Sequence, residues 1–123
     1  MVDHDRDHGV VAIVDDDAAV RDSLKFLLEV AGHTVDAYAS ATAFLEDHTS
    51  QPSCLILDQH MPTMTGLELA ARLRTEGWRI PILLITAQPS SAINTRAAEL
   101  NISNVLEKPL VEADLLNFIA VGD

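Results

Sequence analysis

The 123-residue chain contains one cysteine, Cys54, so it cannot form an intrachain disulfide, and this is compatible with a reducing compartment. It also lacks any apolar run approaching the roughly 20 residues that a membrane-spanning helix needs. The first residues, MVDHDRDHG, are polar and charged and do not have the pattern of a signal peptide. We therefore expect residues 1–8 to form a disordered leader, and we expect a cytoplasmic protein that does not associate with membranes.

Basic residues are scarce, with 8 Lys and Arg against 19 Asp and Glu, which gives a formal net charge of −11. A field of this sign repels phosphate backbones, so this chain alone should not bind nucleic acid. Hydrophobic residues make up 48% of the sequence, which is enough for one domain of this size to bury a core without metal or disulfide support. The remaining question is whether the acidic residues form a site or only a solvated surface.

Strand-like and helix-like segments alternate five times along the chain. Short apolar or alternating runs predict strands, and apolar residues at helical spacing predict helices between them. This alternation indicates right-handed crossovers and a parallel sheet with helices on both faces. We predict a flavodoxin-like (βα)5 doubly wound α/β domain over residues 9–121, with strand order 2-1-3-4-5. The predicted strands are 10–14, 33–40, 54–58, 79–86 and 104–107, and the predicted helices are 18–31, 41–47, 67–74, 92–100 and 111–120.

Polar residues stand where the predicted strands end. Asp15 and Asp16 follow the first strand, and Asp58 closes the third. Thr86 closes the fourth strand and Lys108 follows the fifth. In open parallel sheets ligands bind beyond the carboxyl ends of the strands, where the strand order reverses. We therefore expect these five residues to share one crevice.

Three carboxylates at close range repel one another, and a divalent cation with oxygen ligands would relieve this repulsion. Mg²⁺ fits best, because it takes one or two carboxylates, keeps several waters and binds phosphate oxygens. Lys108 can pair with a phosphoryl group or with Asp58, and Thr86 can donate a hydrogen bond to a phosphoryl oxygen. These are the parts needed for phosphoryl transfer onto an aspartate.

Single residues also have simpler explanations. An acidic run after a strand is often a helix N-cap, and Asp17 is expected to be one. His4 and His8, among the acids of the leader, could bind metal loosely, but solvated side chains are the better explanation. The conjunction of five polar residues on four strand ends is what favours a site.

Several segments resemble the receiver domain of two-component response regulators. They are IVDDD at 13–17, LILDQHMPTMTGLEL at 55–69, ILLITA at 82–87 and EKP at 107–109. The resemblance extends from about Val10 to Ile119. The stretch from Val20 to Leu45 further resembles receivers that are joined to a helix-turn-helix DNA-binding output domain.

The resemblance implies that Asp58 is the phosphoacceptor. Asp16 would bind Mg²⁺ directly and Asp15 largely through water. The backbone carbonyl of His60 would complete the protein ligands. The His60 side chain would also influence the lifetime of the acyl phosphate.

The resemblance further implies that Thr86 and Lys108 contact the phosphoryl group. Ala87 would leave the site open to the phosphodonor, and Gln88 would tune the phosphoryl lifetime together with His60. The Lys108–Pro109 bond is expected to be cis, which would aim Lys108 inward.

The implied donor is a sensor histidine kinase or a phosphotransfer protein. The receiver would catalyse its own phosphorylation and dephosphorylation and is otherwise a signalling protein, not an enzyme. Phosphorylation would change the face formed by the fourth helix, fifth strand and fifth helix, which would meet a partner or an output domain. A homodimer through that face, or through the first and fifth helices, is compatible with the resemblance.

The sequence departs from the family pattern three residues before the lysine, where the family usually has Phe or Tyr. This chain has Val105, which cannot swing between buried and exposed rotamers as an aromatic ring does. The acceptor residues are intact, so we expect normal phosphorylation chemistry and an altered readout.

Three other classes of function share this sheet or use an aspartate nucleophile. A flavodoxin-like cofactor binder needs a Ser-, Thr- or Gly-rich loop after the first strand, whereas DDDAAV stands there. A phosphatase of the haloacid dehalogenase type needs a second Asp two residues after the nucleophile, where this chain has His60. A receiver-like binding module that signals without phosphorylation is compatible with Val105 and stays the alternative.

Overall fold

The computed structural model describes residues 9–122, with side chains described for residues 9–120. The predicted leader over residues 1–8, including His4 and His8, lies outside the described residues. No helix in the described part of the chain is long and apolar enough to cross a membrane.

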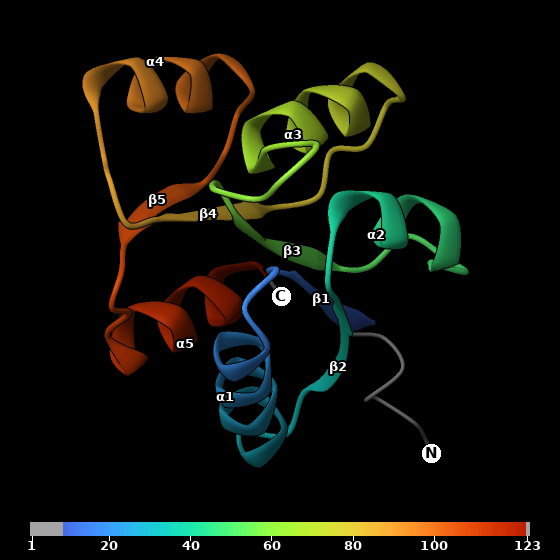
Figure 1. Ribbon diagram of the computed structural model, residues 1–123. Coiled ribbons are helices and arrows are strands. Elements are labelled where there is room, and N and C mark those ends of the chain that lie inside the picture. Colours follow the sequence, from blue (N-terminus) through green and yellow to red (C-terminus); the bar gives the residue numbers. More distant parts are fainter. Residues whose placement is uncertain (1–8, 123) are drawn as a thin grey trace.

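Strands and helices alternate through the described chain, as Figure 1 shows. The five strands form one parallel sheet in the order β2-β1-β3-β4-β5, so the predicted fold class and strand order are confirmed. The elements are β1 (Val10–Val14), α1 (Ala18–Val30), β2 (Thr34–Tyr38), α2 (Ala41–Asp47), β3 (Cys54–Asp58), α3 (Gly66–Thr75), β4 (Ile82–Thr86), α4 (Ser91–Glu99), β5 (Asn104–Glu107) and α5 (Glu112–Gly122).

The apolar composition of the two central strands β3 and β4 follows from their burial. All five residues of β3 and all five of β4 are buried, because helices cover both faces of the sheet. α1 and α5 lie on one face, and α2, α3 and α4 lie on the other (Figure 1). Successive side chains of a strand point to opposite faces, so Leu55 and Leu57 pack toward α3 while Ile56 packs toward α1 and α5.

The fourth strand is shorter than predicted, since it begins at Ile82 and not at residue 79. Pro81 has no N–H to donate to the ladder, although its carbonyl accepts a hydrogen bond from the Leu55 N–H at 3.0 Å. The strand is therefore limited to the five residues whose last member is Thr86.

Side-chain caps fix the helices that follow the strands. Asp17 is the N-cap of α1, as predicted, and its carboxylate accepts hydrogen bonds from the backbone N–H groups of Ala19 and Val20. Thr65 and Glu68 form a reciprocal capping box at the start of α3. These caps hold the loops at the carboxyl edge of the sheet, where the candidate site lies.

Candidate functional site

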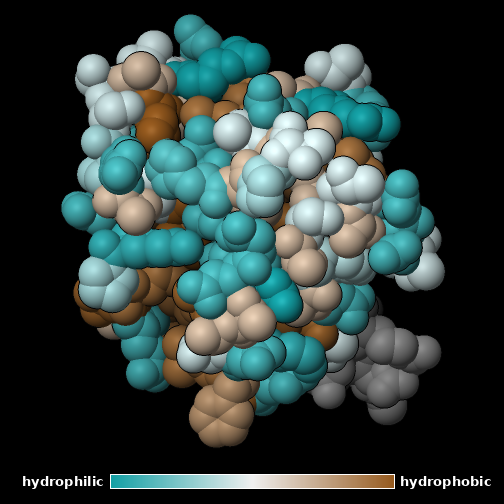
Figure 2. All heavy atoms as spheres, in the orientation of Figure 1, coloured by the Kyte–Doolittle hydropathy of each residue, from teal (hydrophilic) through white to brown (hydrophobic). Residues whose placement is uncertain are grey.

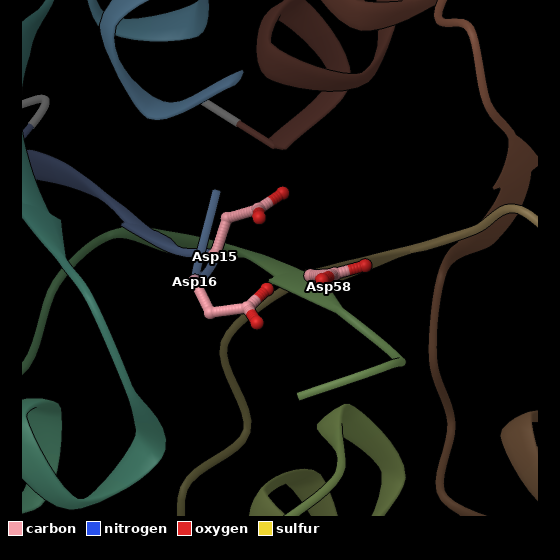
Figure 3. A group of neighbouring side chains, drawn as sticks. All are labelled: Asp15, Asp16 and Asp58. Carbon is pink, nitrogen blue, oxygen red and sulfur yellow. The ribbon is translucent and has the colours of Figure 1, made fainter. Parts of the chain in front are cut away.

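Three carboxylates meet at the carboxyl edge of the sheet. Asp15 and Asp16 follow β1 directly, and Asp58 is the last residue of β3, which pairs with β1. One carboxylate oxygen from each lies within 4.8 Å of the others, and Figure 3 shows the two strand ends bringing them to a common space. Asp15 is 1% exposed and Asp58 is 4% exposed, whereas Asp16 faces solvent. Hard oxygen ligands in this arrangement fit a divalent cation.

The loop after β1 is held by its own hydrogen bonds. The Asp17 N–H donates to Asp15 Oδ1 at 2.9 Å, and the Asp15 N–H donates to the Tyr38 carbonyl at 3.1 Å. The guanidinium of Arg21 donates from Nη1 to the Asp15 carbonyl at 2.8 Å, which ties α1 to the loop. The sequence analysis did not identify Arg21, because a basic residue in the first turns of a helix carries no signal for a contact with a preceding loop.

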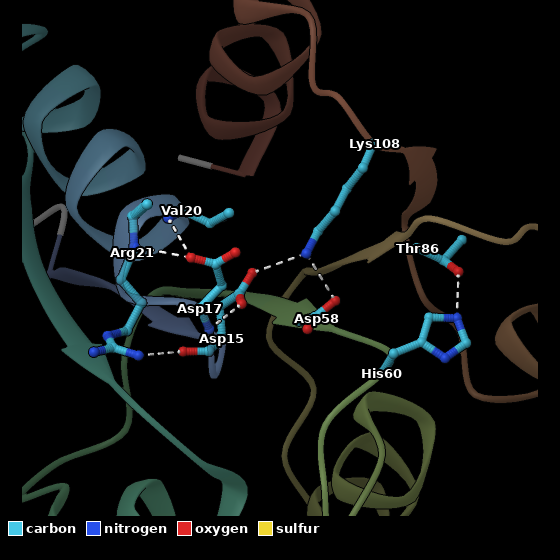
Figure 4. A network of polar contacts seen from close by, with 9 residues as sticks. Asp15, Asp17, Val20, Arg21, Asp58, His60, Thr86 and Lys108 are labelled. Carbon is cyan, nitrogen blue, oxygen red and sulfur yellow. Dashed lines mark hydrogen bonds and ion pairs between the residues drawn. The ribbon is translucent and has the colours of Figure 1, made fainter.

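Lys108 reaches the acidic cluster from the loop after β5 (Figure 4). Its Nζ lies 3.2 Å from Asp58 Oδ1 and 3.3 Å from Asp15 Oδ2. The Lys108 N–H donates to the Thr86 carbonyl at 2.9 Å, so β4 positions the backbone of this residue. The Lys108–Pro109 bond is cis, as expected. The structure thus brings Asp15, Asp16, Asp58 and Lys108 together.

The charges in this cluster perturb one another. Burial raises the pKa of Asp58, and the nearby Asp15 raises it further, while Lys108 and the His60 backbone N–H offset part of the rise. Burial lowers the pKa of Lys108, but the two carboxylates outweigh this effect and the net pKa is raised. Lys108 therefore stays protonated, and one cation is shared between two buried acids. A bound divalent cation would relieve the repulsion that remains.

Thr86 closes β4 as predicted and is fully buried, but its hydroxyl does not join the acidic cluster in this structure. Thr86 Oγ1 lies 3.0 Å from His60 Nε2 and accepts a hydrogen bond from the Gln88 N–H, also at 3.0 Å. Ala87 and the side chain of Gln88 are exposed beside it. The contact with His60 was not predicted, because the two residues are 26 positions apart and the sequence does not show how the β3–α3 loop folds back.

Val105 lies opposite Leu84 in the β4–β5 pair, so it stands two positions before the level of Thr86. Its side chain is partly buried and packs against the core that also contains Leu84 and Ile102. It fills space in this core and offers no polar atom to Thr86.

Gln59, in the β3–α3 loop, and Gly66, the first residue of α3, support the site and were missed by the sequence analysis. Gln59 is buried, and its Oε1 accepts a hydrogen bond from the Leu67 N–H at 2.9 Å, which caps α3 a second time. A Cβ atom on Gly66 would lie 2.6 Å from the Asp58 carbonyl oxygen and 2.8 Å from Leu84 Cδ1. Glycine is thus required here for α3 to approach the end of β3. The helix predicted from the sequence begins at residue 67, one residue after Gly66.

The architecture and the site together allow comparison with known proteins. The family model described as the response regulator receiver domain matches residues 11–120. The chain belongs to this family. The resemblance seen in the sequence is therefore confirmed, and the chain is a receiver domain of the two-component response regulator type.

Relatives of known name are response regulators from bacteria. The chain is 36% identical over 107 residues to the transcriptional regulatory protein FixJ of Azorhizobium caulinodans, covering 86% of this chain and 51% of FixJ. It is 39% identical over 111 residues to the response regulator protein TmoT of Ectopseudomonas mendocina, covering 89% of this chain and 50% of TmoT. Full-length FixJ from B. japonicum has a similar structure, with a TM-score of 0.82 and 35% identity over 93% of this chain and 57% of that one. The receiver chain spans about half the length of the curated relatives that it matches.

Proposed function

We propose that the Asp58 carboxylate accepts a phosphoryl group from a phosphohistidine of a sensor histidine kinase or phosphotransfer protein in the cytoplasm. The observation that carries this proposal is the placement of Asp58. It is buried at the end of a central strand, and its Oδ1 lies 3.2 Å from Lys108 Nζ. The carboxylates of Asp15 and Asp16 lie close enough to share a cation with it. A nucleophile, a cation site and a fixed positive charge are the requirements of phosphoryl transfer to an aspartate.

Mg²⁺ is the cofactor that the donor set fits. Asp16 would bind it directly, Asp15 largely through water, and Asp58 and the His60 backbone carbonyl would complete the protein ligands. When bound, the ion neutralises charge on the carboxylates and on the incoming phosphoryl group. Lys108 already occupies one side of the cluster, against Asp15 and Asp58, so the exposed carboxylate of Asp16 marks the side that is open to a hydrated ion.

The transfer step would use Asp58 and Lys108 as they lie in the cluster, and Thr86 beside it. An oxygen of Asp58 forms a bond to phosphorus as the phosphorus–nitrogen bond of the donor breaks, and the donor imidazole leaves. Lys108 stabilises the charge on the transferred group, and the Thr86 hydroxyl donates to one of its oxygens after turning toward it. Ala87 adds no bulk beyond its methyl group at the entrance. The same residues would support hydrolysis by water, with the side chains of His60 and Gln88 affecting its rate.

The readout of this chemistry would lie on the face formed by α4, β5 and α5. No residue of β5 is fully buried, and Val111, just before α5, is 59% exposed. The visible face in Figure 2 is mainly hydrophilic, with hydrophobic side chains gathered where β5 leads into α5. We infer that this region meets a partner or an output domain, or a second copy through α4-β5-α5 or through α1 and α5.

Incubation with acetyl phosphate and Mg²⁺, followed by intact mass measurement, tests the proposed function. The wild-type chain should gain the mass of one phosphoryl group, and Asp58→Asn should not. Asp36→Asn is the matched control, because it removes an exposed carboxylate from β2 and leaves the cluster untouched. Failure of the wild-type chain to gain mass with any small donor would contradict the proposal and favour the binding module.

A further inference from the structure

The His60 side chain contacts the Thr86 hydroxyl, which the proposed transfer needs. Its Nε2 lies 3.0 Å from Thr86 Oγ1, and Figure 4 shows the threonine hydroxyl turned toward the imidazole ring while Lys108 reaches the acids. The Gln88 N–H donates to the same oxygen. Thr86 is fully buried, so these two groups replace the water that would otherwise solvate the hydroxyl.

The contact opposes the turn that Thr86 has to make. Whichever atom of the pair carries the hydrogen, a rotation of the hydroxyl toward a phosphoryl group on Asp58 moves Oγ1 away from His60 and from the Gln88 N–H. Two hydrogen bonds are therefore lost as the new one forms. The unphosphorylated arrangement is stabilised by the imidazole, and the energy of that contact sets part of the bias between the two arrangements.

His60 and Val105 differ in what they can do when Thr86 turns. Val105 is partly buried in the core, carries no polar atom and cannot exchange one hydrogen-bond partner for another. His60 is exposed on the β3–α3 loop, so its ring can move into solvent once the contact is broken. Of these two residues, the one that is free to respond to Thr86 is thus His60, on the acceptor side of β4.

We propose that the His60 side chain is a positioning residue that holds the Thr86 hydroxyl away from Asp58 and is released when the phosphoryl group is bound. This inference rests on the proposed function and adds to it. In this role the imidazole acts through Thr86. It shifts the equilibrium between the hydroxyl held against His60 and the hydroxyl turned toward Asp58. The role is separate from any metal contact of the His60 backbone carbonyl, which a side-chain substitution retains.

Equilibrium binding of beryllofluoride with Mg²⁺ tests the inference without interference from hydrolysis. His60→Leu keeps a similar volume and removes the hydrogen bond, so it should bind roughly two- to tenfold more tightly than wild type, the range expected for loss of one neutral hydrogen bond from the unloaded state. His60→Gln is the matched control, because its side-chain amide can reach Thr86 in place of Nε2. It should bind with an affinity close to that of wild type.

A double-mutant cycle shows whether the effect passes through Thr86. Thr86→Val removes the hydroxyl with little change in shape, and in that background His60→Leu should leave the affinity unchanged. An equal gain in both backgrounds would overturn the inference, because His60 would then act on the pocket directly. Equal affinities for wild type and His60→Leu, or a His60→Gln variant that behaves like His60→Leu, would also overturn it.

Nitrogen chemical shifts give a readout that does not depend on activity. In the wild-type protein, the His60 Nε2 resonance and the Gln88 amide resonance should both shift on loading, since both groups lose Thr86 Oγ1. A His60 resonance that stays in place while the Asp58 loop responds would contradict the release of the ring. If wild-type protein binds no beryllofluoride at all, the proposed function fails together with this inference. If it binds and the variants do not differ, only the inference fails.

Discussion

The acceptor pocket and the α4-β5-α5 face lie at neighbouring parts of one sheet but are built differently. In the pocket, Asp15 and Asp58 are buried and share the Lys108 ammonium, and every residue of β3 and all of β1 except Val10 are buried. On the face, no residue of β5 is fully buried, and α4 buries only Ala97 within its bounds. The proposed acceptor site is thus carried by buried, central backbone, whereas β5 and α4 of the proposed readout face bury few residues and can move at lower cost.

The pocket side should be the more sensitive to small steric changes, and Gly66→Ala should show the largest effect. The added Cβ would lie 2.6 Å from the Asp58 carbonyl oxygen, and the clash is with backbone, which cannot move aside. We expect a loss of about 2–4 kcal/mol in the free energy of unfolding, measured by denaturant titration. Gly77→Ala is the comparison: nothing lies within 4 Å of its Cβ, so only its φ of 94° opposes alanine, at about 1 kcal/mol. Equal losses in the two variants would show that the close approach at Gly66 does not exist.

Mg²⁺ should raise the stability of the folded protein by binding at the pocket and not at the α4-β5-α5 face. A ligand that binds only the folded state adds about 2.7 kcal/mol at one hundred times its Kd, so the melting temperature should rise with Mg²⁺ concentration. Asp16→Asn should abolish most of this rise, because it removes the exposed carboxylate of the cluster. Asp114→Asn, an exposed acid of α5, is the control and should keep the full rise. A rise that survives Asp16→Asn would place the ion elsewhere.

Removal of the Asp58 charge should increase stability in Mg²⁺-free buffer, by less than the ion does. The folded-state pKa of Asp58 is raised by burial and by Asp15, so stability falls as the pH rises from the ordinary carboxyl pKa to this raised pKa, and the full cost of the ionised form is present above it. Wild-type stability should therefore fall relative to Asp58→Asn as the pH rises through this range. The difference should vanish below the ordinary carboxyl pKa, where Asp58 is protonated in both states. Denaturant titrations from acid to neutral pH would measure this, and a difference that grows toward acid would contradict the assigned direction.

Val105→Ala, in β5, should have the smallest effect of these substitutions. Val105 is partly buried in the core, so we expect a loss of about 1 kcal/mol in stability from the missing methyl groups. Beryllofluoride affinity should be unchanged, because the side chain offers no polar atom to Thr86. A change in affinity as large as that expected for His60→Leu would show that Val105 in β5 is coupled to Thr86.

The sequence was sufficient to predict the order of the strands and helices and the charged residues of the pocket. Apolar runs that end in acids identify β1 and β3, and the parallel topology then brings Asp15, Asp16 and Asp58 together. The predicted start of the fourth strand, at residue 79, is too early. The apolar pattern runs through Pro81, which has no N–H for the ladder, and β4 begins only after it.

Contacts that depend on tertiary placement could not be predicted. The Arg21 guanidinium, the buried Gln59 amide and the His60 ring are polar groups of types that usually face solvent. Their partners are backbone groups or distant side chains, and no spacing in the sequence relates them to one another. Such contacts decide how the pocket is held, whereas the strand ends decide where it lies.

The decisive measurement is the position of the phosphoryl group on the chain. After reaction with acetyl phosphate and Mg²⁺, borohydride reduction converts an aspartyl phosphate to homoserine, and peptide mass spectrometry then locates the modified residue. We predict homoserine at position 58 and at none of the other acids of the cluster. Homoserine at position 15 or 16, or a phosphoryl group on any other side chain, would contradict it.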